Sequence, residues 1–214
     1  RDVSEHSPLA RLSQELPGRI VPICVDVTDD ESLQAAVATV REHTDAIEIL
    51  VNNAGVMTNK AFLVKAPRGK DPKRQDIWRE LEVNTLSPIF VSKAFVPLLS
   101  ASPAPLKKIV NISSYLGSVG GAGPNASGGM WGTRVSKAGL NAATKCMAFE
   151  FYRQGRDPII AVALHPGYVR TNIGGPQAAI EPQESAAGLF QVITSLTESD
   201  NGTFKNYQGK ELPW

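Results

Sequence analysis

Polar and glycine residues directly follow four short apolar runs in this chain of 214 residues. In chain order these segments are Asp26-Val27, Asn53-Ala54-Gly55, Ser113-Ser114 and His165-Pro166-Gly167. If the runs are parallel strands, all four segments lie at one sheet edge, and Lys137 reaches the same edge from a helix. Ligands of open α/β sheets bind outside the carboxyl ends of the strands. Ordinary turn chemistry explains any one segment, whereas the whole set indicates a ligand site with hydroxyl and ammonium groups.

A metal centre is not expected. His6, His43 and His165 are scattered without the spacing of a ligand set. His165 stands at the predicted edge and is a minor catalytic candidate, although a structural role is favoured.

The elements that position these residues follow from periodicity. The runs at residues 20–27, 47–53, 108–113 and 159–164 are short and apolar nearly throughout, which is typical of parallel strands covered on both faces. Thr28 and Glu31 form an expected capping box for a helix carrying Leu33 and Ala36. Further helices are expected at about 74–99, 132–152 and 184–196. The alternation predicts an α/β, Rossmann-like three-layer sandwich with a mainly parallel sheet.

The length and composition indicate one domain, residues 1–214, with enough apolar residues to form a hydrophobic core. Apolar residues make up 42% of the chain, and 22 basic against 21 acidic residues leave a formal charge of +1. We therefore expect neither nucleic acid nor a membrane as partner. Cys24 and Cys146 lie in apolar stretches and are expected to be buried, which fits a cytoplasmic location. No stretch approaches the roughly 20 apolar residues that span a bilayer.

In this order and spacing the motifs resemble those of the short-chain dehydrogenase/reductase family. The closing stretch resembles the branch of sniffer-type carbonyl reductases and C-factor-like proteins, which are mostly NADP(H)-dependent. The matching motifs are Asp26-Val27, NNAG at 52–55, Asn84 in VNTLSP, NISS at 111–114, VSK at 135–137, and HPGYVRTNIGGP, PQESAAGL and ELPW near the end.

The resemblance implies roles for individual residues. Ser114 would bind the substrate carbonyl, Lys137 the nicotinamide ribose, and Asn84 a proton-relay water. The implied NADP(H)-binding residues are Arg1 at the 2′-phosphate, Asp26 and Val27 at the adenine, Asn53, Ala54 and Gly55 at the adenosine ribose, Lys137, and Pro166, Val169 and Thr171 around the nicotinamide. The implied apolar substrate pocket consists of Tyr115, Leu116, Met130, Trp131 and Tyr168, with core packing as the competing interpretation. The expected partners are a small apolar substrate and further copies in a homodimer or homotetramer.

Two departures from the family pattern stand out. The first is Thr133, which occupies the position four residues before Lys137 where the family has its acidic tyrosine. A phenol titrates near a pKa of about 10 and lower beside an ammonium, whereas an aliphatic hydroxyl does not titrate in that range. Loss of a positioned acid costs about 10²–10⁴-fold in rate. The second is that no glycine-rich turn precedes Arg1, so the first β-α(-β) unit, roughly 30 residues, is expected to be absent.

Three hypotheses for function follow. The main one is a catalyst that has left hydride transfer and promotes a non-redox step (cyclisation, isomerisation or elimination) without a cofactor, using Ser114, Lys137, Asn84 and Thr133. The alternative is an NADP(H)-dependent carbonyl reductase whose N-terminus is unrepresented and whose tyrosine was replaced. The third is a non-catalytic binding or dimerisation module.

Overall fold

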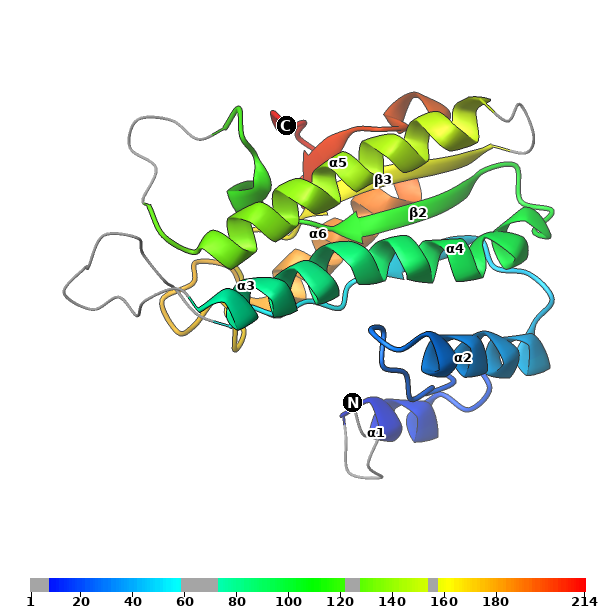
Figure 1. The fold of residues 1–214 in the computed structure, drawn as a ribbon. Helices are drawn as coiled ribbons and strands as arrows, with labels where there is room; N and C mark the ends of the chain where they lie inside the picture. The colour runs from blue at the N-terminus through cyan, green and yellow to red at the C-terminus, as the bar shows by residue number, and fades with distance from the viewer. Residues whose placement is uncertain (1–7, 59–72, 122–127, 154–157) are drawn as a thin grey trace.

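A parallel sheet of four strands in the order β1-β2-β3-β4 forms the centre of the molecule (Figure 1). The computed structural model describes residues 8–58, 73–121, 128–153 and 158–214. The strands are β1 (Ile49–Asn52), β2 (Lys107–Ile112), β3 (Ile159–His165) and β4 (Phe204–Asn206). In register, Val51 lies opposite Val110, and Val110 lies opposite Val162. Because all pairs are parallel, the carboxyl ends of the strands share one edge, as expected.

Helices cover both faces of this sheet. The α-helices of the described residues are α1 (Pro8–Glu15), α2 (Asp30–His43), α3 (Arg74–Leu81), α4 (Ser87–Ser100), α5 (Trp131–Arg153) and α6 (Pro182–Ser195), and of these α1 and α2 lie away from the sheet. Figure 1 shows α4 and α5 on one face and α6 on the other. The expected three-layer α/β sandwich is therefore confirmed.

Successive strand residues enter two different cores. Val110 and Val162 pack with Val192 of α6. Their neighbours Ile109 and Ala161 pack on the other face with a cluster that includes Leu99 of α4 and Met147 of α5. Side chains alternate between the faces of a strand, so a sheet covered on both sides needs apolar residues at nearly every position. This requirement explains why the strands appear in the sequence as nearly unbroken runs of apolar residues.

The predicted helix at 74–99 is interrupted by a π-helical turn. Residues Glu82–Leu86 form this turn between α3 and α4, and Asn84 lies in it. Such turns occur frequently at functional sites. Among the described residues, the stretch Arg74–Ser100 is long and apolar enough by length and composition to cross a membrane, contrary to our sequence-based expectation. Here Leu98 and Leu99 are fully buried, and α4 packs on β1 and β2.

Three local predictions were wrong. Residues 20–27 form no strand, because a strand needs a hydrogen-bonded neighbour and none of the described strands pairs with this segment. The cap of α2 is Asp29, whose carboxylate accepts the Ser32 N–H, and not Thr28. Cys24 and Cys146 are exposed, since apolar neighbours in sequence do not determine which way one side chain points.

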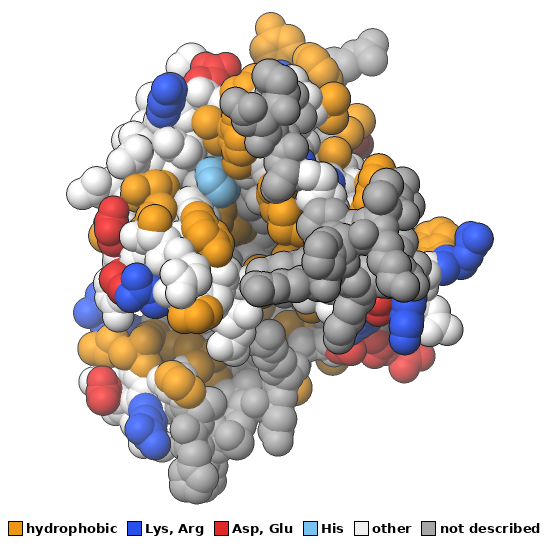
Figure 2. All heavy atoms as spheres, turned by 90° about the vertical axis from the view of Figure 1, so that its left-hand side faces the viewer, with side chains coloured by type: hydrophobic (Ala, Val, Ile, Leu, Met, Phe, Trp, Pro, Cys, Tyr) orange, Lys and Arg blue, Asp and Glu red, His pale blue; other side chains and the backbone are white. Residues whose placement is uncertain are grey.

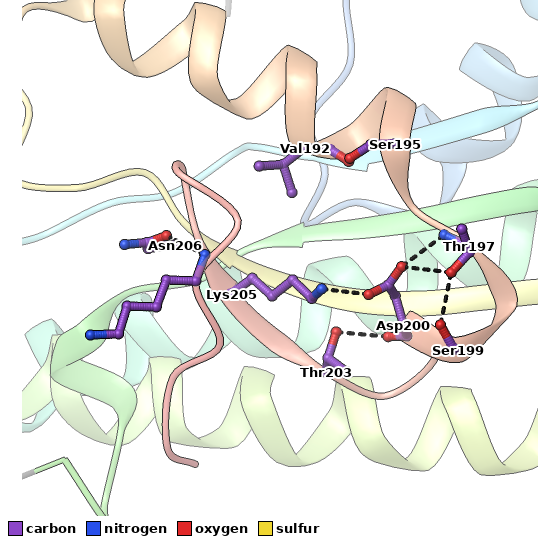
Figure 3. A network of polar contacts seen from close by, with 9 residues as sticks. Val192, Ser195, Thr197, Ser199, Asp200, Thr203, Lys205 and Asn206 are labelled. Atoms are coloured by element: carbon purple, nitrogen blue, oxygen red, sulfur yellow. Dashed lines mark hydrogen bonds and ion pairs between the residues drawn. The ribbon is translucent and has the colours of Figure 1, made fainter.

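The short strand β4 was not predicted and is held by a polar network (Figure 3). Lys205 on β4 forms an ion pair with Asp200, and Asp200 also accepts hydrogen bonds from the backbone N–H and the hydroxyl of Thr197 at 2.8 and 3.0 Å. These contacts fix the 3₁₀ turn Glu198–Asp200 to β4 and complete the sheet beside β3.

Candidate active site

Lys137 joins helix α5 to the carboxyl ends of β1 and β2. Its ammonium group donates a hydrogen bond of 2.6 Å to the Ile112 carbonyl at the end of β2. A Cβ atom added to Gly55, just after β1, would lie 3.8 Å from Lys137 Nζ and 3.4 Å from Asn84 Oδ1. Burial disfavours the charged form and lowers the pKa of Lys137 to about 8. Of the three ammonium donors, the described residues occupy one, which leaves two for a ligand within this part of the chain.

Ser114 follows β2. The turn directly after Ser114 packs against the backbone of Lys137 on α5. The turn Tyr115–Gly117 packs so tightly on α5 that a Cβ on Gly117 would lie 2.6 Å from the carbonyl carbon of Lys137. Ser114 is partly exposed, and its Oγ accepts the Leu116 N–H at 3.2 Å. This contact uses a lone pair, and the hydroxyl donates to none of the described residues, so its proton can bind a carbonyl oxygen. Ser113 differs, because it is buried and its hydroxyl donates to Asn141.

Asn84 is an organising residue of the site. Its side chain is 1% exposed and accepts the Val56 N–H while donating to the Val56 carbonyl and to Ser136 Oγ. These bonds hold the segment after β1 against α5. Both amide protons of Asn84 are thus used within the protein, and its role at a relay water stays a prediction.

His165 ends β3 beside the turn that follows Ser114. Its Nδ1 accepts the Tyr115 N–H at 3.2 Å, and the two rings lie 6.2 Å apart. Burial lowers the pKa of His165 to about 4, so the imidazole is neutral near pH 7. A neutral ring that accepts a backbone N–H has the structural role favoured from the sequence.

The candidate cofactor residues lie at the carboxyl edge or just before α2. Asp26 is exposed, and its Oδ1 accepts both the N–H and the hydroxyl of Thr28, which lowers the pKa of Asp26. Val27 is half-buried beside it, whereas Asn53 and Ala54 are exposed. Arg1 lies outside the described residues.

The segment after β3 makes a sharp turn. Gly167 has a φ of +87°, and a Cβ there would lie 2.4 Å from the Ile180 side chain, so only glycine fits. Pro166 accepts a hydrogen bond from Ser185, while Val169 forms a parallel bridge with Ile180. Thr171 is exposed at the end of this turn.

These residues fit a dinucleotide. The small side chains after β1 leave the backbone accessible, Lys137 has free donors, and Asp26 Oδ2 accepts no hydrogen bond from the described residues. Such a set suits ribose hydroxyls and an adenine amine.

The predicted substrate residues lie on the surface of this region. Tyr115, Trp131 and Tyr168 are exposed, with Leu116 and Met130 half-buried. Figure 2 shows the side of the molecule to which the strand ends point, with hydrophobic side chains spread over this face and charged ones mostly toward its rim. A separate cavity of about 610 Å³ lies elsewhere, lined by residues that include Phe149 and Tyr152 of α5 and Pro158 at the start of β3. It therefore belongs to the opposite end of the sheet.

Thr133 contacts a buried carboxylate that the sequence analysis missed. The hydroxyl of Thr133 donates to Glu80 Oε2 at 2.7 Å, and Glu80 is 1% exposed. In the sequence, Glu80 reads as one more charged residue of a polar helix. The available signal was its position four residues before Asn84, which places both side chains on one helix face.

Comparison with known proteins shows the family. The family model "short chain dehydrogenase" matches residues 3–181. The chain belongs to the short-chain dehydrogenase family. It is similar to C-signal of Myxococcus xanthus, with 34% identity over 171 residues, covering 80% of this chain and 95% of that protein.

Two solved structures are also similar. Carbonyl reductase Sniffer of D. melanogaster has a TM-score of 0.85 and 33% identity, covering 96% of this chain and 82% of its own. An NADPH-bound carbonyl reductase from chicken fatty liver has a TM-score of 0.83 and 32% identity, covering 100% and 85%. These likenesses favour the carbonyl reductase hypothesis. They give no support to a non-redox reaction or to the expectation that no cofactor binds.

Proposed function

We propose that this protein is an NADP(H)-dependent carbonyl reductase acting on small apolar aldehydes or ketones. The observation that carries the proposal is the packing of the Ser114 turn against the backbone of Lys137 at the carboxyl edge of the sheet. It brings a hydroxyl donor and an ammonium to the place where an α/β sheet binds its ligands. The similarity to carbonyl reductases, one of them NADPH-bound, supports the same conclusion.

Each residue has a distinct task in this proposal. Ser114 Oγ donates to the substrate carbonyl oxygen and stabilises the negative charge that develops there. Lys137 binds ribose hydroxyls with its free donors, and Asp26 accepts from the adenine amine. The segment from Pro166 to Thr171 encloses the nicotinamide, and Tyr115, Leu116, Met130, Trp131 and Tyr168 form an apolar substrate surface. The bound cofactor supplies the hydride.

The proposal extends to assembly and location. We infer that copies of the chain associate as a homodimer or homotetramer in the cytoplasm, and that the substrate is a small molecule. Light scattering of the purified protein measures the assembly directly.

The test is NADPH binding followed by turnover. Binding of NADPH to the purified protein is measured by the change in nucleotide fluorescence, and turnover by the loss of NADPH absorbance with aromatic aldehydes and apolar ketones. Lys137→Met should weaken binding about tenfold or more, because a hydrogen bond from a charged group contributes about 1.5–3 kcal/mol. Lys145→Met is the matched control, since Lys145 lies on the same helix with its ammonium over the Trp214 ring. A protein that neither binds NADPH nor consumes it would contradict the proposal.

A further inference from the structure

Glu80 is an unusual residue for the interior of this fold. Its side chain is 1% exposed, and both carboxylate oxygens are engaged. Oε1 accepts the backbone N–H of Thr58 at 2.9 Å and the Thr58 hydroxyl at 2.7 Å, while Oε2 accepts the Thr133 hydroxyl at 2.7 Å. In the part of the chain that the structure describes, no lysine or arginine pairs with it. A buried carboxylate without a cation is costly, so this position calls for an explanation beyond packing.

The position of Thr133 relates this carboxylate to the site. Thr133 lies four residues before Lys137 on α5 and therefore on the same helix face. Ser136 Oγ donates to the Thr133 carbonyl at 3.3 Å and accepts from Asn84, which in turn holds the loop beside Lys137. Glu80 and Asn84 also share one face of the helix that packs on α5. The Glu80–Thr133 contact is thus linked to Asn84 through the backbone carbonyl of Thr133 and Ser136.

Thr58 connects the Glu80–Thr133 pair to solvent. Thr58 is exposed, whereas Glu80 and Thr133 are buried. The three side chains therefore form a continuous line from solvent to the interior through two hydrogen bonds of 2.7 Å. A hydroxyl both donates and accepts, and a carboxyl group can take a proton on one oxygen and release one from the other.

We propose that Thr58, Glu80 and Thr133 form a proton relay that delivers a proton from solvent to the oxygen of the reacting carbonyl. The inference rests on the proposed reductase function and names the source of its proton in a chain whose α5 carries no tyrosine at position 133. It makes Thr133 the group that touches the substrate oxygen, with Glu80 and Thr58 acting through it.

Hydride addition and proton transfer together convert the carbonyl group to an alcohol. When the carbonyl carbon gains a hydride from the reduced nicotinamide, the π electron pair of the C=O bond moves onto oxygen. The O–H bond of Thr133 breaks and its proton bonds to that oxygen. Before this transfer, water has delivered a proton through the Thr58 hydroxyl to Oε1 of the resting carboxylate, and the carboxyl group has turned to present that proton to Thr133. The Thr133 oxygen takes this proton, and Glu80 is left again as the carboxylate that the three donors stabilise. In each turnover one proton therefore enters from water at Thr58 and one leaves on the hydroxyl of the product alcohol.

A purely structural role for Glu80 makes different predictions. Glu80 also packs against Gly132, where a Cβ would lie 2.7 Å from its carboxyl carbon, so its loss disturbs the start of α5 in either case. Substitutions at Thr133 separate the two roles. Thr133→Ser keeps the hydroxyl, and Thr133→Val keeps the shape without it. A relay needs only the hydroxyl, whereas packing depends mainly on the shape.

The experiment compares these variants of the purified protein with Glu80→Gln and Thr58→Val. We measure kcat, the solvent deuterium isotope effect on kcat, NADPH affinity and thermal stability. Thr133→Ser should stay within about threefold of the parent, and Thr133→Val and Glu80→Gln should lose about 10²–10⁴-fold in kcat. NADPH affinity should change less than about threefold in all of them. Thr58→Val should lower kcat less than Thr133→Val or Glu80→Gln does. It should raise the solvent deuterium isotope effect on kcat, because proton delivery from water to Glu80 becomes slower.

An infrared readout needs no bound ligand. The carboxyl stretching band of Glu80, identified by its loss in Glu80→Gln, should shift in Thr133→Val and stay in place in Thr133→Ser. An unshifted band in Thr133→Val, or a kcat of Thr133→Val equal to that of Thr133→Ser, would overturn the relay even if the parent protein reduces carbonyls. A parent protein that neither binds nor oxidises NADPH overturns the reductase proposal itself, and the relay falls with it.

Discussion

The ammonium of Lys137 donates a hydrogen bond of 2.6 Å to the carbonyl oxygen of Ile112, the last residue of β2. This bond holds the middle of the candidate site together, because Ile112 is two residues before Ser114 and Lys137 packs against the turn after it. It also places a charge where water is largely excluded, which has a measurable consequence.

The burial of Lys137 predicts a characteristic dependence of stability on pH. Its pKa of about 8 in the folded protein lies below the value of 10.5 in the unfolded chain. Between these two values the unfolded state binds more protons, so this group raises the free energy of unfolding as pH increases from 8 to 10.5. The difference in unfolding free energy between the parent and Lys137→Met should shift in favour of the parent by up to about 3 kcal/mol over this range. Urea denaturation of both proteins at several pH values measures it, and parallel pH profiles would show that the pKa is not lowered.

His165 predicts a second pH dependence, at the acid end. Its pKa of about 4 in the folded state lies below 6.5, so the unfolded chain takes up the proton first as pH falls. The free energy of unfolding should therefore drop by up to about 3 kcal/mol between pH 6.5 and pH 4. Protonation also removes the acceptor of the Tyr115 N–H. His165→Gln should lose this part of the acid sensitivity, while the same change at exposed His43 should not.

The two neighbouring serines should separate turnover from stability. Ser114→Ala removes the proposed carbonyl donor and should lower kcat about 10²–10³-fold with little change in the unfolding free energy. Ser113→Ala removes the donor to the buried Oδ1 of Asn141 and should cost about 1–3 kcal/mol of stability while leaving kcat within a fewfold. A large loss of kcat in Ser113→Ala together with an unchanged kcat in Ser114→Ala would contradict the assignment of Ser114 as the carbonyl donor.

A tyrosine at position 133 should bypass Glu80. Thr133→Tyr places a phenol one helical turn before Lys137, and the ammonium there favours its ionised form. This variant should reduce carbonyls faster than the parent, and adding Glu80→Gln to it should no longer lower kcat. If Glu80→Gln costs the same factor in both backgrounds, Glu80 acts through structure alone.

Much of this fold was readable from the sequence, because burial on both faces marks the strands at Lys107–Ile112 and Ile159–His165. Two of the wrong strand predictions have one cause, which is that strand formation depends on a distant partner strand. Residues 20–27 have a strand composition without a strand neighbour, and β4 has only three residues that become a strand by pairing with β3. The cap of α2 lay one residue from the prediction because Thr28 and Asp29 are both good capping residues.

The candidate site was likewise predicted in part and missed in part. The sequence order of strand-end residues predicts that Gly55, Ser114 and Lys137 come together, since parallel strands present their carboxyl ends at one edge. Glu80 was not predicted as a site residue because its burial depends on Thr58 and Thr133, which lie 22 and 53 residues away in the sequence. Apart from its position four residues before Asn84, no local pattern distinguishes Glu80 from a solvated helix residue.

Isotope transfer from the cofactor tests the central claim most directly. The unmodified protein is incubated with an apolar aldehyde and NADPH that carries deuterium at its hydride-transferring carbon, and the products are analysed by mass spectrometry. The account predicts an alcohol with one deuterium on the former carbonyl carbon. Recovery of unchanged aldehyde, or of an alcohol without the label, would contradict it.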